Sequence, residues 1–210
     1  MDELIVRLAR TIACMPRLAL LSAIGRVDEI SPSELARQLR MSRHLVSAHL
    51  LRLSAVALIQ RRRSGAWHYC RPGSPYRVET LSGQLASWLQ GFLGGATGPH
   101  EDLGVQQLRD ASGEELADRP RVLVFDAATA FTSVRRLQIL RYVSGTPAKS
   151  ATLCAELHMS HAAAGRHLGK LVRRGFVVAG GSPRRAVYRL ATTFATPVHA
   201  RLFEIISEHW

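Results

Sequence analysis

The chain contains one pattern of residues twice, and the two occurrences lie 118 residues apart. When residues 35–53 are aligned with residues 153–171, seven of the nineteen positions are identical: Leu35, Leu39, Met41, Ser42, His49, Leu50 and Leu53 fall on Leu153, Leu157, Met159, Ser160, His167, Leu168 and Leu171. The alignment continues on both sides with single-residue shifts, and it pairs Tyr69 with Tyr188. Solenoid repeats are far shorter, roughly 20–50 residues. The chain is therefore predicted to fold as two related units, for which 210 residues suffice.

Each copy predicts helices joined by a short turn. It opens with an apolar helix, "PRLALLSAI" at 16–24 or "RRLQILRYV" at 135–143. In the first copy "SPSE" at 31–34 follows; its first serine can cap a helix, its proline suits the first turn, and its glutamate can close a capping box. Ser42 and Ser160 can cap the next helix of their copies. Two helices joined by so short a turn are typical of a helix-turn-helix.

Two short β-forming runs around a turn follow the helices in both copies. They are "ALIQRRRSGAWHYCR" at 57–71, with a basic tip, and "GFVVAGGSPRRAVYRL" at 175–190. Three helices with a β-hairpin make a winged helix. The predicted fold class is therefore mainly α with small β-hairpin wings, in two tandem winged helix-turn-helix domains. We expect the first domain at 1–93, an acidic connector at 94–118 and the second domain at 119–210.

The positive charge of the chain is concentrated in two blocks. The net charge is +12, and 47% of the residues are apolar, so a packed core is expected. Residues 16–77 carry eleven arginines against three acidic residues, and residues 121–210 carry thirteen Lys or Arg against four. Residues 78–120 between them carry two arginines against seven acidic residues. Two basic blocks around an acidic centre indicate two polyanion-binding units and a connector.

The motif SxxxxSxHLxxL at 42–53, followed by an apolar triplet, a hairpin and a tyrosine-bearing strand, resembles the winged helix-turn-helix of the ArsR-type regulators. "PRLALLSAI" is similar to the opening helix of that family, one residue shorter. The resemblance spans residues 1–93 and 119–210 and implies a DNA-binding regulator. Members of this family usually carry one such domain per chain and act as homodimers through their first and last helices, whereas this chain carries two.

The third helix of the first copy is predicted to bury one side and to present donors on the other, because base edges are read by hydrogen bonds. Four apolar residues are expected to be buried: Leu45, Val46, Leu50 and Leu53. Arg43 and His44 lie in the first turn, which approaches bases in this motif. The residues placed for phosphates are Ser42, Ser47, His49 and Arg52. The wing is predicted to contact the minor groove or the backbone through Arg61, Arg62 and Arg63.

The matching helix of the second copy is predicted to be a poorer reader. Gly165 stands where the first copy has Ser47, and glycine inside a helix costs about 1 kcal/mol against alanine. We expect this copy to bind DNA mostly through phosphates. The predicted contacts are Ser160, His161, Arg166, His167 and Lys170 from the helix, with Arg184 and Arg185 from the wing.

The cysteine and histidine pattern argues against a metal site. Cys154, His158 and His161 are spaced as ligands on one helical face would be, but the repeat places a turn at 158–160, so they do not share a helix. We predict no metal and no cofactor. Three cysteines without a CxxC spacing indicate no disulfide framework and fit a reducing cytoplasm.

Enzyme and membrane functions find no support in the pattern. No Ser/His/Asp set, carboxylate pair or phosphate-binding glycine loop can be assigned, so we predict that the protein is not an enzyme. No apolar run is long enough to span a bilayer, so no membrane association is expected.

Three helices carry more apolar surface than one small domain needs. They are expected near 78–93, with Val78 on its apolar face, near 196–210 and at the N-terminus. The chain is therefore predicted to act as a monomer whose copies pair as a pseudo-dimer, or as a homodimer. The predicted function is a cytoplasmic, sequence-specific regulator that binds double-stranded DNA and represses transcription. A plasmid replication initiator and a winged-helix protein-interaction module are the alternatives, because both use tandem winged helices.

Overall fold

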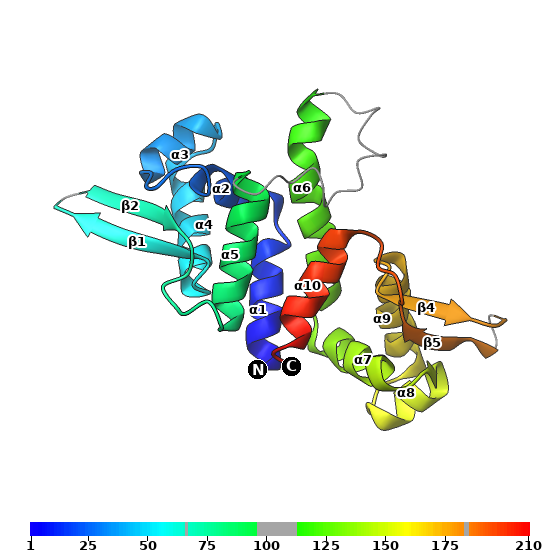
Figure 1. Ribbon diagram of the computed structural model, residues 1–210. Helices are drawn as coiled ribbons and strands as arrows, with labels where there is room; N and C mark the ends of the chain where they lie inside the picture. Colours follow the sequence, from blue (N-terminus) through cyan, green and yellow to red (C-terminus); the bar gives the residue numbers. More distant parts are fainter. Residues whose placement is uncertain (66, 96–112, 183–184) are drawn as a thin grey trace.

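A computed structural model describes residues 1–65, 67–95, 113–182 and 185–210 (Figure 1). The first half contains α1 (Asp2–Ile12), α2 (Met15–Ile24), α3 (Pro32–Gln38), α4 (Arg43–Ala55), β1 (Ile59–Ser64), β2 (Trp67–Pro72) and α5 (Leu81–Gly94). The second half contains α6 (Gly113–Ala128), η2 (Thr129–Phe131), α7 (Val134–Gly145), β3 (Ala148–Lys149), α8 (Ser150–Glu156), α9 (His161–Arg173), β4 (Val177–Gly180), β5 (Val187–Leu190) and α10 (Pro197–Ser207). The predicted fold class, mainly helical with small antiparallel hairpins, is confirmed.

The helix starts that were predicted from hydroxyl residues are confirmed. Ser31 accepts a hydrogen bond from the backbone of Glu34, whose carboxylate accepts one from the Ser31 backbone, so the capping box is complete. Ser42 Oγ accepts from the backbone N–H of the third residue of α4, and Ser160 Oγ does the same in α9. These caps satisfy N–H groups that have no partner within a helix. They fix where α4 and α9 begin.

Both halves also repeat their turns. The residue two positions before the N-cap of α4 and of α9 has a positive φ, 51° at Arg40 and 48° at His158. After α4 and α9, Ala57 and Gly175 have φ values of 57° and 68°. Positive φ is costly for residues other than glycine. The duplication has therefore kept the backbone path even where the residue type changed.

The sheets show that the predicted alignment of the wings was wrong by one residue. In the first half Ile30 forms an isolated bridge with Cys70. In the second half Ala148, at the equivalent position, pairs with Tyr188 within the β3-β5-β4 sheet. Tyr188 is therefore the counterpart of Cys70 and not of Tyr69, and the separation of 118 residues continues through the wing. The sequence suggested the wrong alignment because each strand contains one tyrosine, and matching Tyr69 with Tyr188 shifts the alignment by one residue.

The four helices α1, α5, α6 and α10 lie between the two winged units, whose hairpins point away from each other (Figure 1). We call these four the central helices. Helix α1 contacts α6, η2 and α7, and α5 contacts α10. The apolar side chains of both halves form one continuous core, in which α1 contributes Ile5, Leu8 and Ile12, each no more than 2% exposed. The copies therefore share a core.

Two details of the central helices differ from expectation. Val78 is 63% exposed, because α5 begins only at Leu81, after an N-cap at Thr80. Helix α6 begins at Gly113 and crosses the predicted start of the second domain at residue 119. Most of the predicted connector, 96–112, lies outside the described residues.

Candidate nucleic-acid interface

Helix α4 buries one side and exposes the other. Val46, Leu50 and Leu53 are 0–2% exposed and pack into the core. The exposed side carries most of the predicted contact residues: Ser42, Arg43, His44, Ser47 and Arg52. Their exposure is what a DNA contact requires, and the contact itself stays a prediction.

Two residues of α4 lie on the opposite side from the one predicted. His49, predicted to contact phosphate, is only 9% exposed, and its Nδ1 is buried without a hydrogen-bond partner. Leu45, predicted to be buried, is 42% exposed. The buried stripe of the helix runs through Val46, His49, Leu50 and Leu53, at the spacing of one helical face, and Leu45 lies about a quarter of a turn from the centre of that stripe.

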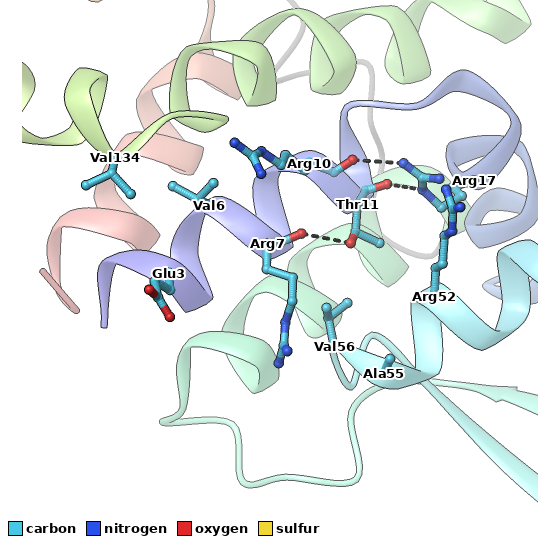
Figure 2. Close-up of a pocket in the computed structure, with 10 residues that line it drawn as sticks. All are labelled: Glu3, Val6, Arg7, Arg10, Thr11, Arg17, Arg52, Ala55, Val56 and Val134. Atoms are coloured by element: carbon cyan, nitrogen blue, oxygen red, sulfur yellow. Dashed lines mark hydrogen bonds between the residues drawn. The ribbon is translucent and has the colours of Figure 1, made fainter.

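A buried arginine lies beside His49. Arg17 is 7% exposed and donates from its guanidinium to the backbone oxygens of Arg10 and Thr11, near the C-terminal end of α1 (Figure 2). Cations are favourable at this end of a helix, where carbonyls are unpaired. Burial, with Arg17 and Arg52 nearby, holds the pKa of His49 below its ordinary value. Arg17 belongs to α2, which packs on α4, so this arginine joins the helix beneath α4 to the C-terminal end of α1.

The second half repeats this arrangement. Arg136 donates to the backbone oxygens of Thr129 and Ala130 at 3.1 and 2.8 Å. Burial first, and then the positive charges of Arg136 and Arg166, lower the pKa of His167, which is half-buried rather than fully exposed. Sequence reasoning missed Arg17 and Arg136, although both precede leucine in the aligned opening helices. The arginine shared by the two opening helices was the sequence signal that could have identified this contact.

The wing of the first unit has three arginines with different surroundings. Arg62 donates to both carboxylate oxygens of Glu29, at 2.8 and 2.9 Å, and its guanidinium lies 5.7 Å from the ring centre of Tyr69. The hydrogen bond from Arg62 lowers the pKa of Glu29. Arg63 donates to the backbone oxygen of Gly65 in the turn, and Arg61 is exposed. Arg62 is therefore oriented by the protein, while Arg61 lies on the other face of the hairpin.

The outer side of α9 is cationic. Ser160, His161 and Arg166 are exposed, and Lys170 is half-buried with its pKa lowered by burial and by Arg174. Arg173, which sequence reasoning did not select, is exposed at the C-terminal end of the helix. On the wing, Arg185 is exposed, while Arg184 lies outside the described residues.

The three residues considered as metal ligands are divided between elements. Cys154 lies in α8, which ends at Glu156, His158 lies in the turn, and His161 begins α9. Cys154 Sγ is 3.5 Å from His161 Nδ1. Within the described ranges, no three His, Cys, Asp or Glu side chains gather as metal ligands would.

An open groove of about 580 Å³ lies beside the C-terminal half of α4 (Figure 2). Its lining includes four arginines: Arg7, Arg10, Arg17 and Arg52. In the second unit the positions that match Arg7 and Val56 are Asp126 and Arg174, which form an ion pair. The lining also includes Glu3, so the groove of the first unit carries a net positive charge, whereas in the second unit Asp126 neutralises Arg174.

The comparison with protein families gives one match, to the model of the MarR family, over residues 15–66 and 126–186. The first segment runs from the start of α2 through β1, and the second runs from the end of α6 through β4. A comparison with curated proteins found no match. Among the described residues, no helix combines the length and apolar character needed to cross a bilayer. The resemblance to ArsR-type regulators is not supported, although both families use winged helices. The chain belongs to the MarR family of winged-helix transcription regulators, with two copies of the family's domain in one polypeptide.

Proposed function

We propose that this chain represses transcription by binding a specific double-stranded DNA site as a pseudo-dimer, with α4 and α9 reading two half-sites. The observation that carries the proposal is the pair of capped, outward-facing reading helices attached to one shared core. In a homodimer of single-domain subunits, two identical readers are held by an interface between chains. Here the central helices supply the corresponding support within one chain.

Apolar contacts support an intrachain pseudo-dimer. Helices α1 and α6 pack on each other, as do α5 and α10, and these are equivalent elements of the two copies. In α10, Leu202 and Ile205 are fully buried. Burial of a leucine-sized side chain stabilises a protein by about 1.5–3 kcal/mol. Part of the apolar surface noted in the sequence therefore packs against the other copy, which supports the proposed pairing.

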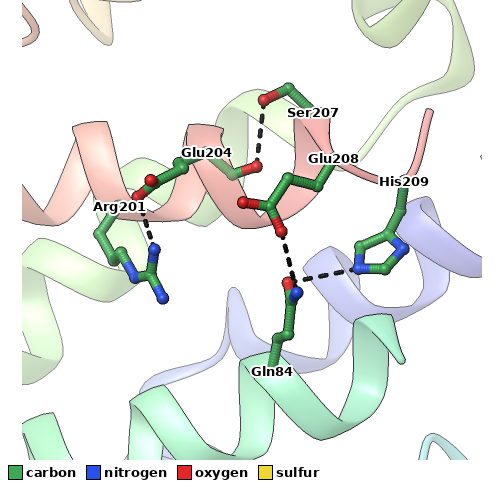
Figure 3. A network of polar contacts seen from close by, with 6 residues as sticks. All are labelled: Gln84, Arg201, Glu204, Ser207, Glu208 and His209. Atoms are coloured by element: carbon green, nitrogen blue, oxygen red, sulfur yellow. Dashed lines mark hydrogen bonds and ion pairs between the residues drawn. The ribbon is translucent and has the colours of Figure 1, made fainter. Parts of the chain in front are cut away.

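Polar contacts between the halves support the same arrangement. Gln84 of α5 donates to Glu208, just after α10, at 2.9 Å, and its Oε1 lies 3.3 Å from His209 Nε2 (Figure 3). Near the N-terminus, Arg141 of α7 donates to Asp2 of α1 at 2.7 Å. These contacts connect different elements of the two halves, so they restrict how one winged unit can rotate against the other.

Repression follows from occupancy. Two reading helices separated by about one turn of DNA, roughly 34 Å, cover two successive major grooves on one side of the duplex. A protein held there excludes polymerase from an overlapping promoter. The net charge of +12 favours the association, which we place in the cytoplasm.

The test is to select binding sites from a random duplex library with the full chain and to measure the stoichiometry of the complex by light scattering. We expect one chain per site and an asymmetric site, because α4 and α9 present different residues. A reporter gene with this site in its promoter should be repressed by the chain. Two chains on a short perfect palindrome would contradict the pseudo-dimer, and lack of reporter repression despite binding would contradict the repressor role.

A further inference from the structure

The exposed side of α4 carries an apolar row where a DNA-reading helix is expected to be polar. Leu45, Ala48 and Leu51 are spaced three residues apart, so they adjoin on the helix surface. Leu45 is 42% exposed and Leu51 is 56% exposed, with the half-buried Ala48 between them. Single exposed leucines are common, but this row lies on the side of the helix that faces away from the core. It leaves two large aliphatic side chains available to a partner.

The surroundings of the row indicate what that partner is. Exposed His44 and Ser47 lie beside it, and the exposed guanidinium-bearing residues Arg43 and Arg52 flank it. A purely apolar partner would strip water from these polar groups without pairing them, which is unfavourable. The major groove instead offers phosphates, hydrogen-bonding base edges and one apolar group, the 5-methyl of thymine.

The second unit lacks the row. The positions that match Leu45, Ala48 and Leu51 are Ala163, Arg166 and Gly169, so α9 presents a guanidinium between two small residues. Both helices are capped in the same way and bury equivalent leucines. The apolar row is therefore not demanded by the fold.

We infer that Leu45, Ala48 and Leu51 recognise thymine 5-methyl groups, so that thymine defines the half-site read by α4 and not the one read by α9. The inference rests on the proposed function, since it assumes that α4 enters the major groove. It adds the chemical group that this helix reads.

Replacement of single thymines by deoxyuridine tests the inference, because only the methyl group is removed and the hydrogen-bonding edge is kept. The probe is the duplex selected by the full chain, and the readout is its dissociation constant at fixed salt. We expect a loss of about fourfold for each contacted thymine, which corresponds to one methyl group returned to water. The sensitive thymines should lie in one half-site only.

Leu45→Ala and Leu51→Ala should weaken binding to the thymine duplex and remove most of the difference between thymine and deoxyuridine. Val172→Ala is the matched control, because Val172 is 37% exposed on α9 outside the equivalent row. It should keep the full difference. Circular dichroism verifies that each variant is folded.

The possible failures are distinguishable. If the full chain binds no duplex, the proposed function itself is wrong. If it binds and deoxyuridine has no effect in either half-site, DNA binding stands and the methyl recognition is overturned. If the leucine variants weaken binding equally on both duplexes, the leucines contact another part of the DNA, which also overturns it.

Discussion

In the first unit, the reading helix α4 carries leucines on its exposed side, and the wing beside it carries three consecutive arginines. In the second unit, the reading helix α9 carries small residues and cations instead. The buried sides of α4 and α9 are nearly the same. Leu50 and Leu53 match Leu168 and Leu171, all buried, and the capping serine is common to both. The duplicated fold constrains the residues that pack and cap, because these determine whether the unit folds. The residues that face solvent are free to diverge, and those are the ones that would read DNA.

The difference extends beneath the reading helix. Arg17 and Arg136 occupy equivalent positions and cap equivalent backbone oxygens. Around them, however, the first unit has an open arginine-lined groove, and the second has the Asp126–Arg174 ion pair. The same arginine contact is thus kept beneath α4 and α9, while the charge around it differs. One fold can therefore carry two helices with different proposed DNA contacts.

The largest effects should come from the part that the units share. Leu50→Ala and Leu168→Ala remove equivalent side chains that are 2% and 1% exposed, and each should destabilise the protein by about 2–5 kcal/mol. Because both halves belong to one core, urea unfolding of either variant should remain a single transition. The exposed variant Leu51→Ala serves as the control. Two resolved transitions would show that the units fold independently.

The next effect should separate the two readers. Arg43 and His161 are both exposed first residues of their reading helices. Arg43→Ala should reduce the preference for the selected site over random DNA by roughly 1–3 kcal/mol, the size of a lost bidentate base contact. His161→Ala should change that preference less, because the second unit is proposed to bind mainly phosphates. Equal losses of preference would indicate that both helices read bases.

The sequence predicted the parts of this site that depend on local signals. Serine caps, the turn and the wing follow from residues near one another, and each was confirmed. The sequence predicted the burial of Val46, Leu50 and Leu53 correctly. It exchanged the positions of Leu45 and His49, because leucine suggested a buried residue and histidine an exposed one. It also missed the pairing of Arg62 with Glu29, which are 33 residues apart. Such contacts depend on tertiary packing, and a single sequence does not record it.

A smaller effect concerns salt dependence. Arg166 and Arg173 lie on the exposed side of α9. Replacing either by alanine should weaken binding to selected and random DNA alike and reduce the slope of log K against log salt by about one. Arg201→Ala is the control, since Arg201 is exposed on α10 and pairs with Glu204 of the same helix. An unchanged slope in the α9 variants would place this helix away from the phosphates.

The smallest predicted effect is on the pH dependence of stability, and it tests whether the seating of the two reading helices is equivalent. His49 and His167 have pKa values lowered in the folded chain, by burial first and then by nearby arginines. Each therefore takes up a proton more readily in the unfolded chain, whose histidine pKa is about 6.5. The stability from these neutral histidines is complete above that pKa and falls as the pH drops below it, until the folded chain is protonated too.

His49→Gln and His167→Gln should each flatten the decline in unfolding free energy between about pH 7.5 and 5, a range set by the histidine reference pKa. Urea titrations across this range measure it. Flattening by only one substitution would show that the arrangement around Arg17 and Arg136 supports the two reading helices unequally.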